Sequence, residues 1–339
     1  MGTLRVGLVF DLLGSAPQVR GAPADADAEY EPEQTVEVLE AAVRRLGHHP
    51  VRLGSPRELL TLAARAGDPP VDVAWNIAEG YATRNREAWA PVLLEMLEIP
   101  SLGSDALTLS LSLDKAWAKD VVAAAGVPVP AHRVSDRRGL QGRDLPGPFP
   151  LFVKPRWEGT AKGIGPGSRV EDPQTLQREV DRVVAAYHQP ALVESFLPGA
   201  EYTVAVIGNE PPRALPVLQR AIETTSGIGL HALERHAPAE GWRHELPGEL
   251  EVALEAQLTA IALRAYEALA CRDFARVDLR LDAEGVPHFL EINPLPTFAA
   301  DGSFGILAEL AGRELPDLLA EVLAAGLARL GLDGREAGG

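Results

Sequence analysis

The chain has 339 residues, which is enough for two or three domains with hydrophobic cores of their own. Its net charge of −16 argues against nucleic acid or an anionic membrane as a partner, and no apolar run is long enough to cross a bilayer. The single cysteine, Cys271, excludes a disulfide framework. The first strand pattern begins without a basic, cleavable leader, so we expect a cytoplasmic protein.

Residues 1–103 alternate strand and helix patterns, which predicts an open, mostly parallel α/β domain. Strands are expected at 4–10, 51–53, 71–75 and 99–102, and helices at 32–46, 56–66 and 86–97. Ligands of such sheets lie beyond the carboxyl ends of the strands, where two polar loops, 11–31 and 76–87, follow. The second loop supplies candidate substrate-binding residues, although ordinary surface charge would also explain them: Glu79, Arg84, Arg86 and Glu87.

Residues 104–189 form a second unit, with a helix predicted from a cap at Ser112 to Ala125. A short strand over 151–155 ends in Lys154-Pro155, and a glycine-rich segment, 158–167, comes next. Four glycines in nine residues leave backbone N–H groups free to hold anionic oxygens. The residue order of a Walker A loop is absent. The glycine-rich segment therefore indicates phosphate binding mainly because it follows a strand that ends in a lysine.

The lysines are unusual in number and place. The chain has four lysines against 28 arginines, and all four lie between 115 and 162. Lysine offers a compact, rotatable charge that suits a phosphate held between loops, whereas arginine offers a planar fork. Lys115, Lys154 and Lys162 are therefore of interest for a phosphate site, while Lys119 is expected on a helix surface.

The third unit, 190–327, contains a predicted hairpin that brings polar side chains together, and 328–339 are expected to form a flexible tail. Because side chains alternate along a strand, Arg276 and Asp278 share one face, and so do Glu291 and Asn293. A four-residue turn over 282–285 would set Glu291 opposite Arg276, with Asp278 diagonal to it. Such oxygens suit Mg²⁺ that is also held by phosphate, although a surface salt-bridge cluster would look the same.

Taken in order, these segments resemble the ATP-grasp superfamily and, within it, the D-alanine–D-alanine ligase family. The resemblance rests on motifs that are specific in combination: Asp114-Lys115, Val153-Lys154-Pro155, Glu158-Gly159-Thr160, the strand 192–197, Gly199-Ala200-Glu201-Tyr202-Thr203-Val204, and the segments 272–278 and 290–294. It implies a three-domain α/β ATP-grasp fold, in which an open parallel sheet comes first and ATP lies between the central and C-terminal α+β domains.

The resemblance also implies residue roles. Lys115 and Lys154 would bind phosphate and, with Arg276, act in catalysis, while Gly159, Thr160, Ala161 and Gly163 would form the lid over the triphosphate. Glu194, Phe196 and Leu197 would hold adenine, and Glu201 would contact ribose. Asp278, Glu291 and Asn293 would bind one or two Mg²⁺, or Mn²⁺. Ser303 is a fifth candidate for substrate contact. A homodimer is implied as well.

The implied reaction joins two amino acids through an acyl phosphate, with release of ADP and phosphate. Three departures from the family pattern keep other substrates open. The loop after the first strand lacks the usual substrate-binding Glu segment, and the usual His-Gly turn reads Asn76-Ile77-Ala78-Glu79-Gly80. The family's Asn-Thr-x-Pro-Gly reads Asn293-Pro294-Leu295-Pro296-Thr297, which lacks the glycine near the acyl centre. No lysine follows Lys162, where the family has one that reaches the γ-phosphate; the cations there are Arg220, His231, Arg235 and His236. The alternatives are a ligase for other amino acids, small peptides or another acid, and a nucleotide-binding protein without ligase activity.

Overall fold

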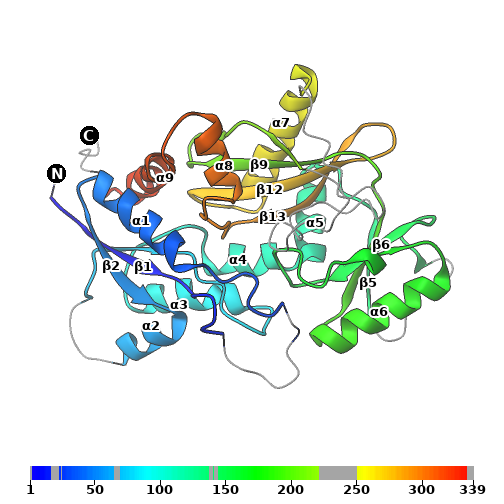
Figure 1. Cartoon of the computed structure of the whole chain (residues 1–339), viewed down its shortest axis with the longest axis horizontal. Coiled ribbons are helices and arrows are strands. Elements are labelled where there is room, and N and C mark those ends of the chain that lie inside the picture. Colours follow the sequence, from blue (N-terminus) through cyan, green and yellow to red (C-terminus); the bar gives the residue numbers. More distant parts are fainter. Residues whose placement is uncertain are drawn as a thin grey trace, which may run out of the picture.

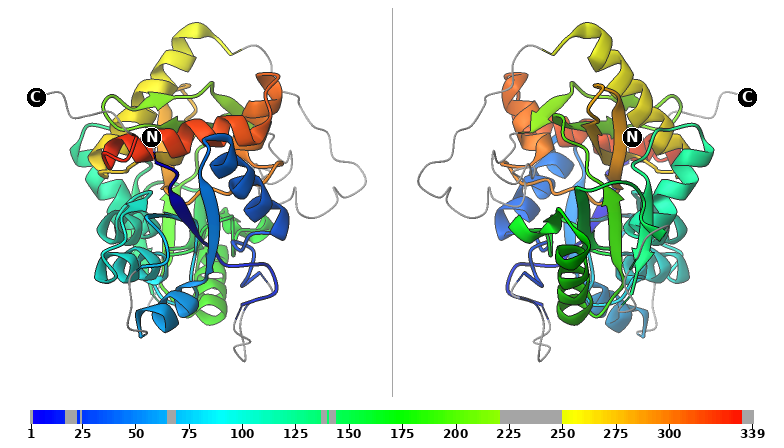
Figure 2. Two further views of the ribbon diagram at one scale, coloured as in Figure 1. Left: turned by 90° about the vertical axis from the view of Figure 1, so that its left-hand side faces the viewer. Right: turned by 90° about the vertical axis from the view of Figure 1, so that its right-hand side faces the viewer.

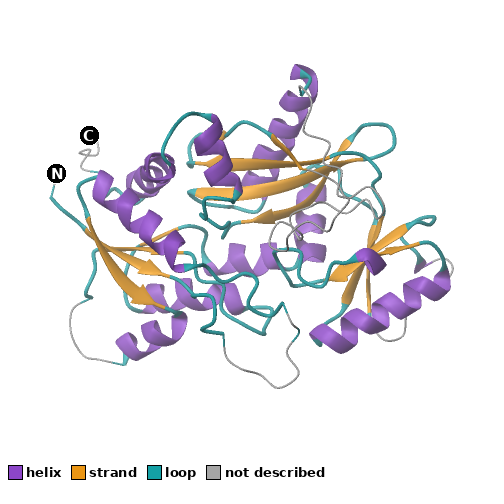
Figure 3. Cartoon of the chain, in the orientation of Figure 1, coloured by secondary structure: helices purple, strands orange, loops and turns teal. Residues whose placement is uncertain are grey.

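The computed structural model of the chain describes residues 2–16, 23, 25–64, 69–136, 140, 144–220 and 250–333. These residues form three sheets, each with its own helices (Figures 1 and 3). The predicted domain boundary after 103 falls between β4 and α4, and the one after 189 falls between α6 and β8. The predicted tail begins inside the last helix, whose Arg329 donates to Asp273, and 334–339 lie outside the described residues.

The first sheet is parallel throughout, as its alternating pattern predicted, in the order β2-β1-β3-β4. Its strands are β1 (Arg5–Val9), β2 (His49–Gly54), β3 (Val73–Asn76) and β4 (Ser101–Leu102). The helices are α1 (Glu33–Arg45), α2 (Pro56–Ala63) and α3 (Trp89–Met96), which follows the 3-10 turn η1 (Arg86–Ala88). The apolar stripe of α1 is fully buried against the sheet at Val36, Leu39 and Val43.

The second unit is antiparallel, in the order β5-β8-β6-β7, with a long helix packed on it. Its elements are β5 (His132–Ser135), β6 (Leu151–Pro155), η3 (Pro166–Ser168), β7 (Arg169–Val170), α6 (Pro173–Tyr187) and β8 (Ala191–Ser195). Two helices precede them, α4 (Ala106–Leu113) and α5 (Lys115–Ala124). The predicted cap at Ser112 is wrong, because Asp114 caps α5 by accepting from Trp117 N–H, and Ser112 lies in α4.

The third sheet runs β10-β9-β12-β13, and β11 also pairs with β9. Its strands are β9 (Glu201–Ile207), β10 (Arg213–Ala214), β11 (Leu218–Arg220), β12 (Phe274–Leu281) and β13 (Pro287–Asn293), and its helices are α7 (Val252–Ala268), α8 (Ser303–Leu310) and α9 (Leu315–Arg329). One core, built from α5 and α7, covers one face of the sheet. No helix among the described residues is long and apolar enough to cross a membrane.

The first and third sheets share a core. α9 packs beside α1, although the two helices lie at opposite ends of the chain (Figure 2). Trp75 at the end of the parallel sheet meets Phe298, which in turn meets Phe274 of β12, with ring centroids 5.7 and 5.3 Å apart. Edge-to-face aromatic packing of this kind fixes relative orientation. The shared core therefore holds the loop 76–87 beside the hairpin β12–β13.

Candidate active site

A cleft lies between the second and third sheets, and most of the predicted nucleotide and catalytic residues line it. The residues that do so are Lys115, Lys154, Thr160, Ala161, Glu194, Phe196, Leu197, Glu201, Arg276, Asp278 and Glu291. They come from α5, β6, β8 and the two residues after it, β9, β12, β13 and the glycine-rich loop, so the cleft exists only where the second and third units meet. Gly159, Gly163 and Asn293 are near it but do not form its lining.

The predicted hairpin is present, but its register differs from the prediction. Asp278 pairs directly with Glu291, and Arg276 pairs with Asn293. The turn leaves Leu281 opposite Pro287, so it holds one residue more than expected, and a bulge after Asp278 shifts the register by one more. A one-residue shift moves a side chain to the other face, and two such shifts restore it. The four side chains therefore still share a face, with the two carboxylates directly opposed.

Each of these carboxylates is paired with a cation. The Arg276 guanidinium lies 2.9 Å from Asp278 Oδ2, and Lys115 Nζ lies 3.1 Å from Glu291 Oε2. Burial would raise the pKa of Asp278, but Arg276 and Arg220 outweigh burial and hold the pKa below its ordinary value. Burial likewise acts against ionisation of Glu291, and Lys115 and Lys154 reverse its effect, so the pKa of Glu291 is also lowered. Both groups are therefore anionic at neutral pH.

The donor chemistry at the hairpin fits Mg²⁺ that is shared with phosphate oxygens. The described residues contain no group of three or more His, Cys, Asp and Glu side chains able to hold a metal by themselves. Two opposed carboxylates and the Asn293 amide, whose Oδ1 already accepts from Leu295 N–H, leave most coordination positions to other oxygens. That is the usual arrangement for Mg²⁺ at a nucleotide, where few protein ligands act with phosphate and water.

The expectation that Lys119 lies on a helix surface is wrong. Its side chain is fully buried, with Nζ 2.7 Å from Glu194 Oε1 and in contact with the Leu290 carbonyl. The other oxygen of Glu194 lies 2.9 Å from Lys154 Nζ. Burial lowers the pKa of Lys119 to about 8, and the two lysines overcome burial to lower the pKa of Glu194 to about 2. Two positive charges thus share one negative charge, which leaves the Lys154 end of the cleft positive.

The other end of the cleft is aromatic. Phe196 is covered by two guanidinium groups, Arg169 at 4.6 Å and Arg280 at 5.2 Å from its ring centroid, and Phe152 lies beside it. Arg280 Nη1 also lies 3.3 Å from Glu201 Oε2, which fixes that carboxylate at the cleft wall. A flat apolar surface with a carboxylate next to it suits a purine and its ribose.

The four predicted substrate residues of the loop 76–87 have different environments: one stacks on a tryptophan, and three are buried. Arg84 stacks on Trp117, with its guanidinium 4.5 Å from the ring centroid. Arg86 and Glu87 are buried, and burial raises the pKa of Glu87 to about 7 against the opposing effect of Arg86. Glu79 is also buried, and both burial and the charge of Glu87 raise its pKa well above the ordinary value. Ser303 starts α8 next to Gly302, which lines the cleft.

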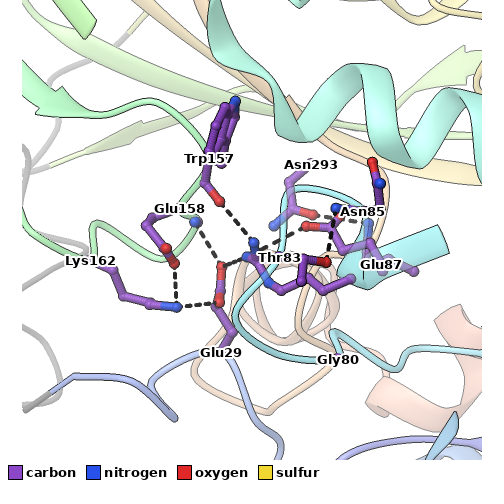
Figure 4. Close-up of polar contacts among 12 residues, drawn as sticks. Glu29, Gly80, Thr83, Asn85, Glu87, Trp157, Glu158, Lys162 and Asn293 are labelled. Carbon is purple, nitrogen blue, oxygen red and sulfur yellow. Dashed lines mark hydrogen bonds and ion pairs between the residues drawn. The ribbon is translucent and has the colours of Figure 1, made fainter. Parts of the chain in front are cut away.

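Lys162, which was of interest for a phosphate site, and Glu29, for which the sequence indicated no role, join the segment 25–31 to the glycine-rich loop (Figure 4). Glu29 Oε1 accepts from Arg86 Nη2 at 2.6 Å and from Gly159 N–H at 2.7 Å. The Arg86 guanidinium also donates to the Trp157 carbonyl at 2.8 Å. Burial opposes ionisation of Glu29, but Arg86 and Lys162 lower its pKa to about 2. The isolated lysine in a glycine-rich loop was the one sequence signal for this contact.

Known proteins resemble this chain over most of its length. A family described as "D-ala D-ala ligase C-terminus" matches residues 124–324. Uncharacterized protein y4sG of Sinorhizobium fredii is 33% identical over 288 residues, which cover 84% of each chain. The chain belongs to the D-alanine–D-alanine ligase family. The family predicted from the sequence is thereby confirmed, and with it the expectation of an ATP-dependent ligase of amino acids.

Other members and solved structures agree with this assignment. A D-alanine–D-alanine ligase of Desulforudis audaxviator is 35% identical over 230 residues, 67% of this chain and 72% of that protein. The crystal structure of D-alanine–D-alanine ligase from Bacillus anthracis complexed with ATP matches 98% of this chain and all of that chain, with a TM-score of 0.73 at 21% identity. VanG D-Ala:D-Ser ligase from Enterococcus faecalis matches with a TM-score of 0.69 at 18% identity. These two structures confirm the ATP-grasp fold.

Proposed function

We propose that this ligase joins two amino acids, activates the first at its carboxylate with ATP, and uses one or two Mg²⁺ ions. One observation carries the proposal: the opposed carboxylates Asp278 and Glu291 lie in the same cleft as Lys115, Lys154 and Arg276. Phosphoryl transfer needs mainly positioning and neutralisation of charge, which this set supplies. D-Alanine is the first substrate to test, because several of the similar proteins are D-alanine–D-alanine ligases.

The proposed reaction has two steps. A carboxylate oxygen of the first amino acid attacks the γ-phosphorus of ATP, ADP leaves, and an acyl phosphate forms. The amine of the second amino acid then attacks the acyl carbon, loses a proton and expels phosphate. Lys115 and Lys154 would bind phosphate oxygens, and Arg276 would stabilise charge on the transferring phosphoryl group and on the tetrahedral intermediate. Mg²⁺ held by Asp278, Glu291 and Asn293 would neutralise the triphosphate.

At a later position in the sequence the family has a lysine that reaches the γ-phosphate, and this chain has no lysine after residue 162. Among the described residues, Arg220 is the candidate to replace it. It lies on β11 with Nε 2.7 Å from Thr203 Oγ1 and Nη2 3.5 Å from Asp278 Oδ1. It therefore stands beside the carboxylate that would bind the metal, on the face that the phosphate chain would occupy. His231, Arg235 and His236 lie outside the described residues.

A ligase for other amino acids or small peptides is the second candidate. It is favoured by the loop 76–87, in which 76–80 replace the family's His-Gly turn and two carboxyl groups, Glu79 and Glu87, are buried. ADP release with D-alanine alone, compared with a panel of D- and L-amino acids, separates the two, and mass spectrometry identifies the amide. ATP binding without an amide from any amino acid would support the nucleotide-binding alternative and refute both candidates. The homodimer, which the mass in solution tests, and the cytoplasmic location stay predictions.

A further inference from the structure

The glycine-rich loop is held by carboxylates from the first domain. Glu29 Oε1 accepts from Gly159 N–H at 2.7 Å, and Asp25 Oδ2 accepts from Gly163 N–H at 3.0 Å. Tyr187 of α6 also donates its hydroxyl to Asp25, at 2.8 Å. Two of the N–H groups that the sequence suggested for phosphate binding thus donate to protein carboxylates. Thr160, Ala161 and Lys162, which lie between the two glycines, line the cleft.

Lys162 completes this contact. Its ammonium lies 2.8 Å from Glu29 Oε2 and also contacts Glu158, and its side chain is 7% exposed (Figure 4). Burial alone would favour the neutral amine, but Glu29 and Glu158 together raise the pKa of Lys162 above its ordinary value. The contact between Lys162 and Glu29 is therefore a buried ion pair between a loop that lines the cleft and a segment of another domain.

An ion pair of this kind is well suited to hold a loop closed. Without Lys162, Glu29 keeps Arg86 as a partner, and without Glu29, Lys162 keeps Glu158. Either change removes the ion pair that joins the glycine-rich loop to the first domain, so the closed arrangement depends on both residues. An acyl phosphate reacts with water as well as with an amine, so the loop must stay closed while that intermediate exists. Water would give back the carboxylate and release phosphate, and one ATP would be consumed without an amide.

We propose that Lys162 and Glu29 are a pair of positioning residues, here named the latch, that hold the glycine-rich loop closed and thereby keep water from the acyl phosphate. The latch rests on the proposed function, because it needs an acyl phosphate to protect. It gives the segment 25–31 a role in coupling ATP use to amide formation, because closure of the lid depends on the first domain, whose Arg86 also holds Glu29.

The test is the number of ADP molecules released per amide formed. Lys162→Met and Glu29→Gln should each raise this ratio from near one to about threefold or more, because water gains access during turnover. The double variant should show no higher ratio than the worse single variant, since both changes break one contact. Asp181→Asn, an exposed carboxylate of α6, is the matched control and should keep the wild-type ratio. Because the ratio counts only active molecules, partial unfolding does not change it.

The outcomes are distinct. A wild-type ratio in active Lys162→Met would overturn the latch, and so would weaker ATP binding at an unchanged ratio, which would assign Lys162 to the phosphates. If Glu29→Gln does not fold, Glu29→Asp keeps the charge beside Arg86 with a shorter reach and should also raise the ratio. If the wild-type protein forms no amide, the proposed function fails together with the latch; if it does and the ratios are unchanged, the latch alone fails.

Discussion

Asp278 of β12 and Glu291 of β13 face each other as directly paired residues, and each carboxylate has its own cationic partner. The two negative charges are thus held close together in a buried cleft by Arg276 and Lys115. A carboxylate pair that is ionised, opposed and surrounded by cations can bind a divalent ion without rearrangement of the strands. The same cations remain available for phosphate oxygens.

Replacing Glu291 by glutamine keeps the size of the side chain and removes its charge. We expect kcat for amino-acid-dependent ADP release to fall on the order of 10²–10³-fold, because a preorganised charge at the reacting phosphate is lost. Steady-state ADP release at saturating ATP and Mg²⁺ measures it. Glu284→Gln, an exposed carboxylate in the turn of the same hairpin, should stay within about twofold of wild type. Near-normal turnover in Glu291→Gln would refute the metal assignment.

Lys119→Met should destabilise the protein, by about 1–3 kcal/mol, because one buried oxygen of Glu194 and the Leu290 carbonyl lose their donor, while Lys154 still balances the charge of Glu194. Denaturant unfolding measures the loss. In a Glu194→Gln background the further loss on Lys119→Met should be smaller than in wild type, because the charged partner of Lys119 is already gone. Additive losses in the double variant would show that the two side chains act independently.

Glu87→Gln should change how stability depends on pH. The folded pKa of Glu87 is about 7 and the unfolded value is near 4.5, so between these values the folded protein holds a proton that the unfolded chain has lost. Glu87 therefore lowers stability as pH rises from about 4.5 to 7, by at most about 3 kcal/mol. Unfolding curves of wild type and Glu87→Gln should converge near pH 4.5 and separate toward pH 7, with the variant more stable. Parallel pH profiles would contradict the raised pKa.

Gly163→Ala should impair the lid, whereas Gly165→Ala should not. Gly163 has a φ of +74°, and a Cβ there would lie 2.5 Å from Pro155 Cγ and 2.9 Å from Tyr187 Cε2. Gly165 has φ of −161°, and a Cβ there would meet nothing within 4 Å. We expect kcat/KM for ATP to fall about tenfold or more in Gly163→Ala, as strain of this kind is worth a few kcal/mol. Equal kcat/KM values for Gly163→Ala and Gly165→Ala would contradict this prediction, because they would show that the loop accommodates the Cβ at Gly163 without strain.

Much of the fold and the cleft could be predicted because the signals were local. The parallel sheet, the hairpin and the lysine-bearing segments follow from side-chain periodicity and short motifs, and the structure brings Lys115, Lys154, Arg276, Asp278 and Glu291 to one cleft. The roles of these residues stay proposals. Errors arose where a single residue decided the outcome: the bulge after Asp278 changed the pairing, and Asp114 displaced Ser112 as the helix cap.

Long-range pairings could not be predicted from the sequence. The sequence around Lys119 predicts a lysine on the surface of α5. Its burial depends on Glu194, which β8 positions beside it from a distant part of the chain. Glu29 and Lys162 are 133 residues apart, and neither segment has a periodicity that indicates the other. A polar contact between two loops is fixed by the packing of the sheets that carry them, and a local pattern does not contain that information.

The most direct test of the central claim follows the oxygen atoms. The amino acid that drives ADP release fastest is supplied with ¹⁸O in its carboxylate, and the released phosphate is analysed by mass spectrometry. Attack of the carboxylate on the γ-phosphorus, followed by amine attack on the acyl carbon, must transfer one labelled oxygen to each phosphate released with an amide. Labelled phosphate matching the amount of amide is the predicted result, and unlabelled phosphate would contradict the acyl phosphate and the account built on it.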